Sequence, residues 1–149
     1  MLQLTTSIEI DATPTAVWNI LLDFTQYPTW NPFIKRVTGD AAPGNRLEIT
    51  IQPPGASAMT FRPKVLVSAA PTELRWIGRL LLPGIFDGEH IFKIEPISKE
   101  RVRFHQTENF TGILIPFVKG SLQGATKKGF ESMNLALKDR AESTSKNSA

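Results

Sequence analysis

The sequence contains no cysteine, and its 149 residues include only two histidines, His90 and His105. Without cysteine the chain can have no disulfide framework, no thiolate metal ligand and no cysteine nucleophile. It also lacks the glycine-rich phosphate-binding loops and the paired-histidine motif of zinc hydrolases. We therefore expect the protein to use neither a metal nor an organic cofactor.

Long apolar runs are missing as well. The longest, at residues 80–86, contains Pro83-Gly84 and is far too short to cross a bilayer. Residues 1–6 lack the basic segment and apolar core of a signal peptide, so we expect no integral membrane segment and a cytoplasmic location. Charge is nearly balanced: 17 Lys and Arg against 14 Asp and Glu give a net charge of +3, without a dense basic block. Nucleic acid is therefore not an expected partner.

What the chain does contain is the composition of an ordinary globular domain, with 41% hydrophobic and 21% charged residues. Its length fits one domain, which we place at residues 1–142. Residues 143–149 are mostly Ser, Thr, Asn and Lys, and we expect them to form a disordered tail.

Hydrophobic periodicity outlines the elements of this domain. Alternating apolar residues predict a first strand over residues 4–10, and a short helix begins near Pro14. Pro28 and Pro32 break this region, so two short helices are expected before the second strand. From there the period changes to two, which predicts strands at 33–37, 47–51, 59–67, 74–80, 88–95 and 102–110. Pro63 lies inside the 59–67 run and favours an edge position or a bulge.

The period returns to that of a helix near the C-terminus. One apolar stripe is formed by Leu122, Thr126, Phe130, Met133 and Leu137. It predicts a helix from about Lys119 to about Arg140. Strands this closely spaced pair as antiparallel hairpins, and the long helix is the element able to cover their apolar face. We therefore expect an α+β fold in which a curved antiparallel sheet of about seven strands wraps around the long C-terminal helix.

Three segments of the chain carry a family likeness. They are ATPTAVWNILLDFTQYPTWNP at residues 12–32, GEHIF at 88–92 and QTENFTGIL at 106–114. The chain resembles the START-like (SRPBCC, helix-grip) superfamily, and within it the bacterial polyketide cyclase/dehydrase-type single-domain group. The resemblance implies a cavity between the sheet and the long helix. It also implies a ligand such as a lipid, sterol, polyketide or plant hormone, and in some relatives a cyclisation or dehydration reaction.

Polar residues occur on the face of the sheet that is predicted to be buried. By strand parity, His90, Gln106 and Glu108 share this face with the apolar residues. A hairpin turn near residue 98 pairs positions whose numbers sum to about 197, which places His90 within reach of Gln106 and Glu108. A turn at Pro83 places Trp76 opposite His90. Three interpretations remain open: the polar groups anchor a ligand, His90 and Glu108 act as acid and base, or the pair is purely structural.

These considerations give a set of candidate ligand-binding residues: Phe61, Trp76, His90, Phe92, Phe104, Gln106, Glu108, Phe130 and Met133. His90 and Glu108 are also the candidate catalytic residues. The favoured function is binding of a hydrophobic or amphipathic small molecule in the internal cavity. The alternatives are a cofactor-free cyclase or dehydratase that uses the His90–Glu108 pair, and a protein-interaction module of the co-chaperone kind.

Two apolar loops need a separate explanation, because an ordinary surface rarely carries both. They span residues 80–86 and 113–118. One interpretation is that they pack on each other. The others are a lid over the cavity, a rim that touches membranes, or a contact in a homodimer.

Overall fold

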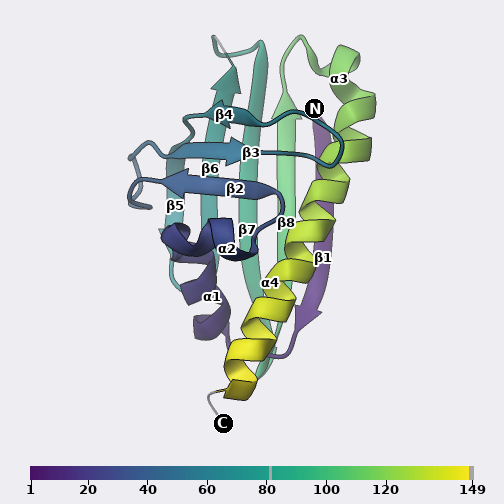
Figure 1. Ribbon diagram of the computed structural model, residues 1–149. Coiled ribbons are helices and arrows are strands. Elements are labelled where there is room, and N and C mark those ends of the chain that lie inside the picture. The colour runs from purple at the N-terminus through teal and green to yellow at the C-terminus, as the bar shows by residue number, and fades with distance from the viewer. Residues whose placement is uncertain (81, 148–149) are drawn as a thin grey trace.

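The computed structural model describes residues 1–80 and 82–147 (Figure 1). Its strands are β1 (Leu2–Ile10), β2 (Ile34–Thr38), β3 (Glu48–Ile51), β4 (Met59–Phe61), β5 (Lys64–Ala69), β6 (Glu73–Leu80), β7 (Phe86–Ser98) and β8 (Arg101–Thr111). Its α-helices are α1 (Pro14–Leu22), α2 (Tyr27–Trp30), α3 (Ile115–Ser121) and α4 (Lys127–Asn147). A short 3₁₀ helix at Phe24–Gln26 precedes α2, and a π-helical segment at Leu122–Thr126 joins α3 to α4.

The strands form two antiparallel sheets. The larger has the order β1-β8-β7-β6-β5, and the smaller has the order β2-β3-β4. Figure 1 shows the smaller sheet crossing in front of the larger one at a steep angle, while α4 runs diagonally across the same face. The space enclosed by the two sheets, α1, α2 and α4 is the interior of the protein. The periodicity predicted antiparallel strands around the long C-terminal helix, and the resemblance implied the helix-grip fold; the structure has both, with the strands divided between two sheets instead of one.

The sheet departs from the prediction at Pro63. The run 59–67, expected as one strand, breaks into β4 and β5, which belong to different sheets, so the structure has eight strands rather than about seven. Proline has no N–H to continue a ladder. The Pro63 carbonyl instead accepts a hydrogen bond from Leu47 N at 2.9 Å, which joins the start of the smaller sheet to this bend.

The N-terminal helices begin and end where the sequence provides caps. Thr13 Oγ1 accepts a hydrogen bond from Ala16 N at 3.1 Å and caps α1, which starts at Pro14. After α2, Asn31 Oδ1 accepts hydrogen bonds from the backbone N–H groups of Phe33 and Ile34 at 3.0 and 2.9 Å. This side chain therefore turns the chain from helix into β2.

The C-terminal helical region is longer than the periodicity indicated. It begins at Ile115 rather than near Lys119 and continues to Asn147 rather than ending near Arg140. The tail expected over residues 143–149 is thus helical as far as Asn147, and residues 148 and 149 lie outside the described part of the chain. Gly129 allows α4 to approach β2 closely, because a Cβ at this position would overlap the Phe33 ring.

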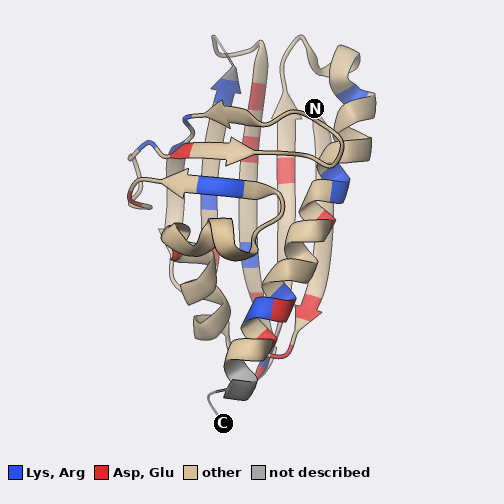
Figure 2. Ribbon diagram, in the orientation of Figure 1, with Lys and Arg blue, Asp and Glu red and all other residues tan. Residues whose placement is uncertain are grey.

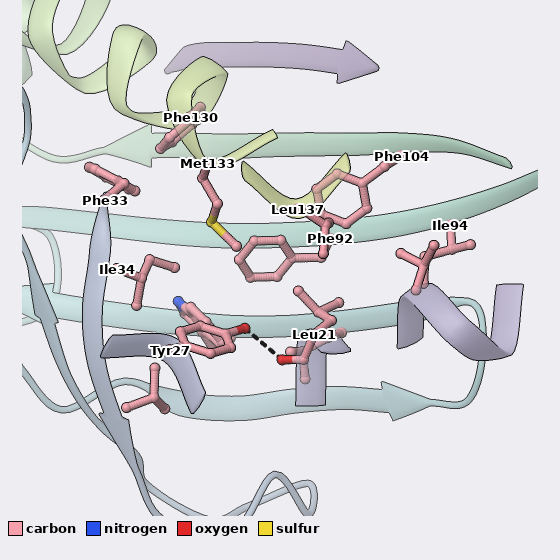
Figure 3. Close-up of a cluster of buried hydrophobic side chains, with 14 of the residues drawn as sticks. Leu21, Tyr27, Phe33, Ile34, Phe92, Ile94, Phe104, Phe130, Met133 and Leu137 are labelled. Atoms are coloured by element: carbon pink, nitrogen blue, oxygen red, sulfur yellow. Dashed lines mark hydrogen bonds between the residues drawn. The ribbon is translucent and has the colours of Figure 1, made fainter. Parts of the chain in front are cut away.

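The interior has two ends, which we name by their place in Figure 1. At the lower end the inner face of the larger sheet carries Leu74, Trp76, Phe92, Ile94 and Phe104. At the upper end it carries Gly78, Phe86, Gly88, Glu108 and Phe110. The lower end is filled by large buried side chains from the helices, namely Leu21, Tyr27, Phe130, Met133 and Leu137 (Figure 3).

Candidate functional site

A row of three directly paired residues crosses the inner face between the two ends. Trp76 lies opposite His90, as predicted, and His90 lies opposite Glu108. The predicted pairing of β7 with β8 was off by one position, since His90 was expected opposite residue 107. Gln106 is the diagonal neighbour of His90, so the expected group of polar residues does come together on the buried face.

The imidazole of His90 is enclosed by aromatic rings. His90 is 4% exposed. Its ring stacks on Phe92 with the centroids 4.3 Å apart, and it also contacts Phe130 at 5.0 Å and Trp76 at 5.6 Å. These contacts leave the ring little freedom to rotate, so its two nitrogens face fixed partners.

The two ring nitrogens have different partners. Nε2 lies 2.9 Å from Gln106 Oε1, and Nδ1 lies 3.3 Å from Glu108 Oε1. Gln106 Nε2 in turn donates to Asn134 Oδ1 at 2.7 Å and to the Phe130 carbonyl at 3.3 Å. The site is therefore one end of a buried hydrogen-bonded network that connects β7 and β8 to α4.

Two members of this network were missed by sequence reasoning. Asn134 Nδ2 donates to Thr6 Oγ1 at 2.9 Å, and the Thr6 hydroxyl reaches the Gln106 carbonyl at 3.4 Å. The signal was present, because Asn134 lies on the stripe of Phe130 and Leu137, and Thr6 lies on the apolar face of the first strand. A polar residue within a buried apolar pattern requires a hydrogen-bond partner, and each of these supplies one to the other.

Glu108 lies at the border of the buried region. Its side chain is 16% exposed. The second carboxylate oxygen, Oε2, lies over Gly88, where any Cβ would overlap it. Among the residues whose side chains the structure describes, Oε2 has no hydrogen-bond partner. Gly88 therefore makes the room that this carboxylate occupies, and Oε2 remains available to another group.

The other candidate residues divide between the two ends. Trp76, Phe92, Phe104, Phe130 and Met133 are buried and pack together at the lower end (Figure 3). Phe61 is half-buried and rests on Gly78 of β6, because a Cβ at Gly78 would lie 3.1 Å from its ring. The cavity implied by the resemblance is therefore filled by side chains at the lower end.

A surface hollow occurs on the opposite face of the larger sheet. It has a volume of about 490 Å³ and is lined by Thr72, Glu73, Lys93, Ile94, Glu95, His105 and Thr107. His105 faces this side, and its Nε2 lies 3.2 Å from Glu95 Oε1. This hollow is separated from His90 by the sheet itself and takes no part in the inner site.

The two apolar loops meet at the upper end. Ile113 N donates to Gly84 O at 3.0 Å, and Leu114 N donates to Ile85 O at 3.1 Å. The loops thus contact each other through their backbones, whereas the side chains of Ile113 and Phe117 are 70% and 83% exposed. Leu81, the second residue of the apolar loop at 80–86, lies outside the described residues.

Metal and membrane features were searched over residues 1–80 and 82–147. Within this part of the chain, His, Asp and Glu side chains form no group of three or more that could hold a metal ion. The helices described there include none that is long and apolar enough to cross a membrane.

Comparisons with known proteins agree with the geometry. The sequence profile of the family described as polyketide cyclase / dehydrase and lipid transport matches residues 1–142. No curated protein sequence matches the chain.

Solved structures share the fold at low sequence identity. A START superfamily protein from Mycobacterium smegmatis is 20% identical, with a TM-score of 0.74 over 95% of this chain and 98% of that one. The Zhui aromatase/cyclase from Streptomyces sp. R1128 is 14% identical, with a TM-score of 0.76 over 95% and 93%. A norcoclaurine synthase point mutant from Thalictrum flavum is 14% identical, with a TM-score of 0.71 over 97% and 96%. The chain thus has the START-like fold and belongs to the polyketide cyclase/dehydrase and lipid transport family.

Proposed function

We propose that the protein binds an amphipathic small molecule at the upper end of its interior. The apolar body of the ligand lies against Phe61, Phe86 and Phe110, and its polar group meets Glu108. The observation that carries this proposal is the pair Gly78 and Gly88, which lie directly opposite each other on the inner face.

Two opposed glycines are an unusual choice for the middle of a sheet. Glycine weakens a strand because it adds backbone entropy and offers no side chain to pack. Here the space above the pair is taken by the Phe61 ring and the Glu108 carboxylate, and both side chains are only partly buried. Because both side chains are only partly buried, they can move aside, and the glycines beneath them then leave room for an incoming molecule.

The surroundings of the pair fit an amphipathic ligand. Phe61 and Phe86 are half-buried, and so is Val118 on α3, which Figure 1 places beside the upper end. Ligand sites combine apolar walls with a few polar groups that fix orientation. Glu108 supplies the polar group, and the joined loops around Gly84 and Ile113 lie at the same end of the interior.

The comparisons support this class of ligand. The family description names polyketides and lipids, and one structural neighbour is an aromatase/cyclase. Another neighbour, a norcoclaurine synthase, was solved with a transition-state analogue bound. The helix-grip fold therefore accommodates small organic molecules in other proteins, although the residues of each site are its own.

Native mass spectrometry of the freshly purified protein, followed by organic extraction, tests the proposal. We expect one small molecule per chain, either carried through purification or taken up from a panel of lipids and polyketides. Gly78→Val should abolish this uptake, because its larger side chain pushes the Phe61 ring into the site. Ile77→Val, on the outer face of the same strand, should leave uptake unchanged. Failure of the wild-type protein to take up any member of the panel would contradict the proposal.

A second candidate function is a cofactor-free cyclase or dehydratase. The observation that favours it is the contact of His90 Nδ1 with Glu108 Oε1, since such a pair can accept and return a proton. Incubation of any bound ligand with fresh protein, followed by mass analysis, distinguishes the two functions. Loss of water or a new ring isomer, absent in Glu108→Leu, supports an enzyme. An unchanged ligand supports binding alone.

A further inference from the structure

Backbone carbonyls fix the direction of the hydrogen bonds that link Thr6, Asn134 and Gln106 to His90 Nε2. The Phe130 carbonyl can only accept, so the Gln106 atom that faces it must be the amide nitrogen. That nitrogen donates its second hydrogen to Asn134 Oδ1. The amide oxygen of Gln106 is thereby directed at His90 Nε2, and since this oxygen can only accept, Nε2 must carry a hydrogen.

The far end of the network gives the same direction independently. The Gln106 carbonyl can only accept, so the Thr6 hydroxyl donates to it. Thr6 Oγ1 then accepts from Asn134 Nδ2, which turns Asn134 Oδ1 toward Gln106. Two backbone carbonyls therefore fix the orientation of both amides and, through them, the tautomer of His90.

This tautomer determines what lies between His90 and Glu108. With the hydrogen on Nε2, Nδ1 of a neutral ring carries a lone pair, and it faces Glu108 Oε1 at 3.3 Å. Two acceptors cannot face each other in a buried site without a hydrogen between them. A proton between these two atoms, on either Nδ1 or Oε1, satisfies both and leaves the pair with no net charge.

We propose that Thr6 and Asn134 are positioning residues that hold His90 as the Nε2–H tautomer, so that Glu108 Oε2 is a hydrogen-bond acceptor for an uncharged hydroxyl group. Oε2 accepts in either location of the shared proton, because the proton lies on the Oε1 side. The other groups packed around the pair are Trp76, Gly88, Phe92, Gln106, Phe110 and Phe130, all uncharged. An anionic ligand group would meet the acceptor Oε2 in a pair that has no net charge. This ligand preference rests on the proposed function, whereas the tautomer does not.

Long-range nitrogen–proton correlation of the histidine rings tests the tautomer without any ligand. The chain has only two histidines, so His90 and the outer-face His105 are readily assigned. We expect His90 Nε2 to carry a hydrogen in the wild-type protein. Gln106→Leu removes the acceptor of that hydrogen, so the proton should move to Nδ1, where Glu108 accepts it. Asn134→Leu should weaken the preference for Nε2–H, and Asn134→Asp should restore it, since a carboxylate oxygen again accepts from Gln106. A wild-type ring protonated at Nδ1 alone overturns the inference, and so does a neutral Gln106→Leu ring that keeps its hydrogen on Nε2.

Three probes of the same shape test the ligand preference: 2-naphthol, 2-methoxynaphthalene and 2-naphthoate. We expect 2-naphthol to bind about tenfold more tightly than 2-methoxynaphthalene, which has the oxygen without the hydrogen. Binding of 2-naphthoate should be the weakest, because its charge meets Oε2.

Variants of Glu108 separate the acceptor oxygen from the carboxylate charge. Glu108→Gln should keep the preference for 2-naphthol, since its amide donates to Nδ1 and still offers an oxygen. Glu108→Leu should abolish it. Equal affinity for the three probes in the wild-type protein overturns the ligand preference and leaves the proposed function standing. Failure of all three to bind counts against the proposed function, and the histidine spectra still decide the tautomer.

Discussion

The two ends of the interior are built on the same three strands, β6, β7 and β8, and yet they differ in every respect that matters for binding. At the lower end the inner-face residues are large, buried and part of one core cluster with side chains from the helices. At the upper end two of them are glycines, one is a carboxylate, and of the aromatic rings Phe110 is buried whereas Phe61 and Phe86 are half-buried. Close packing of side chains at the lower end stabilises the fold, whereas the side chains at the upper end are packed less closely.

The residues that surround the two ends also differ. Figure 2 shows acidic and basic residues side by side where the lower ends of β1 and α4 meet. Glu9 pairs there with Arg101 and Arg103, and Lys138 Nζ donates to the Glu9 carbonyl at 2.9 Å. At the upper end the two apolar loops lie beside a single ion pair, between Arg79 and Asp87, among the described residues. The ion pairs of the lower end therefore join β1 to β8, whereas backbone hydrogen bonds join the two loops at the upper end.

The largest effect is expected from truncating matched aromatic residues at the two ends. Phe104→Ala removes a fully buried ring at the lower end and should lower the free energy of unfolding by about 3–5 kcal/mol. Phe86→Ala removes a half-buried ring at the upper end and should cost about 1–2 kcal/mol, because less surface leaves water in the folded state. Denaturant unfolding of both variants measures the difference. Equal losses would show that the upper end is as well packed as the lower one.

The next effect separates the tight and loose parts of the C-terminal helical region. Gly129→Ala places a methyl group against the Phe33 ring and should destabilise the protein by about 1–3 kcal/mol. Gly120→Ala in α3 meets nothing within 4 Å and should stabilise it by up to about 1 kcal/mol, because alanine favours the helix. Thermal unfolding of the two variants should therefore shift in opposite directions. A stabilising Gly129→Ala would mean that α4 can move away from β2.

The arrangement of the elements could be predicted because it rests on local patterns. The change from period two to period 3.6 located the long helix, and the turns at Pro83 and near Ser98 placed Trp76 and Glu108 close to His90. The division of the 59–67 run between two sheets could not be predicted, because Pro63 is equally compatible with an edge strand, a bulge or a break. The extent of the last helix was missed because helix ends depend on contacts more than on propensity.

The candidate site was predictable only in part. Parity identified His90, Gln106 and Glu108, since a buried face of a strand is specified by alternation. Asn134 and Thr6 joined them through contacts between elements that are 128 residues apart in the sequence, and no local pattern reports such a contact. The role of Gly88 could not be predicted for the same reason. The position that a Cβ would take at Gly88 is occupied by a side chain from the neighbouring strand.

A smaller effect is expected at the only tyrosine of the chain, which packs at the lower end. Tyr27 Oη donates to the Leu21 carbonyl at 2.5 Å (Figure 3), and burial, with a further contribution from Asp23, raises the pKa of Tyr27 far above its usual value of 10.0. A raised pKa means that the neutral phenol stabilises the folded state below pH 10.0 and that this stability is lost as the pH rises further. Phenolate absorbance should therefore appear only together with unfolding, and Tyr27→Phe should cost about 1 kcal/mol at neutral pH. Phenolate formation in the folded protein would show that the lower end admits water.

The smallest effect is expected at the ion pairs that clamp the lower end. The hydrogen bond from Arg103 and the charge of Arg101 lower the pKa of Glu9 below its ordinary value of 4.5. A lowered pKa means that the carboxylate contributes stability above pH 4.5 and that this contribution is lost as the pH falls through the pKa of the folded state. Glu9→Gln should therefore lower the unfolding temperature slightly at neutral pH, and the difference from the wild-type protein should shrink in acid. Because these ion pairs are exposed to solvent, added salt should also reduce this difference in unfolding temperature. Glu48→Gln, which removes an exposed ion pair with Arg62 in the smaller sheet, is the matched control. A difference for Glu9→Gln that persists in acid and in salt would show that the residue acts through packing. The charges of its ion pairs would then contribute nothing to stability.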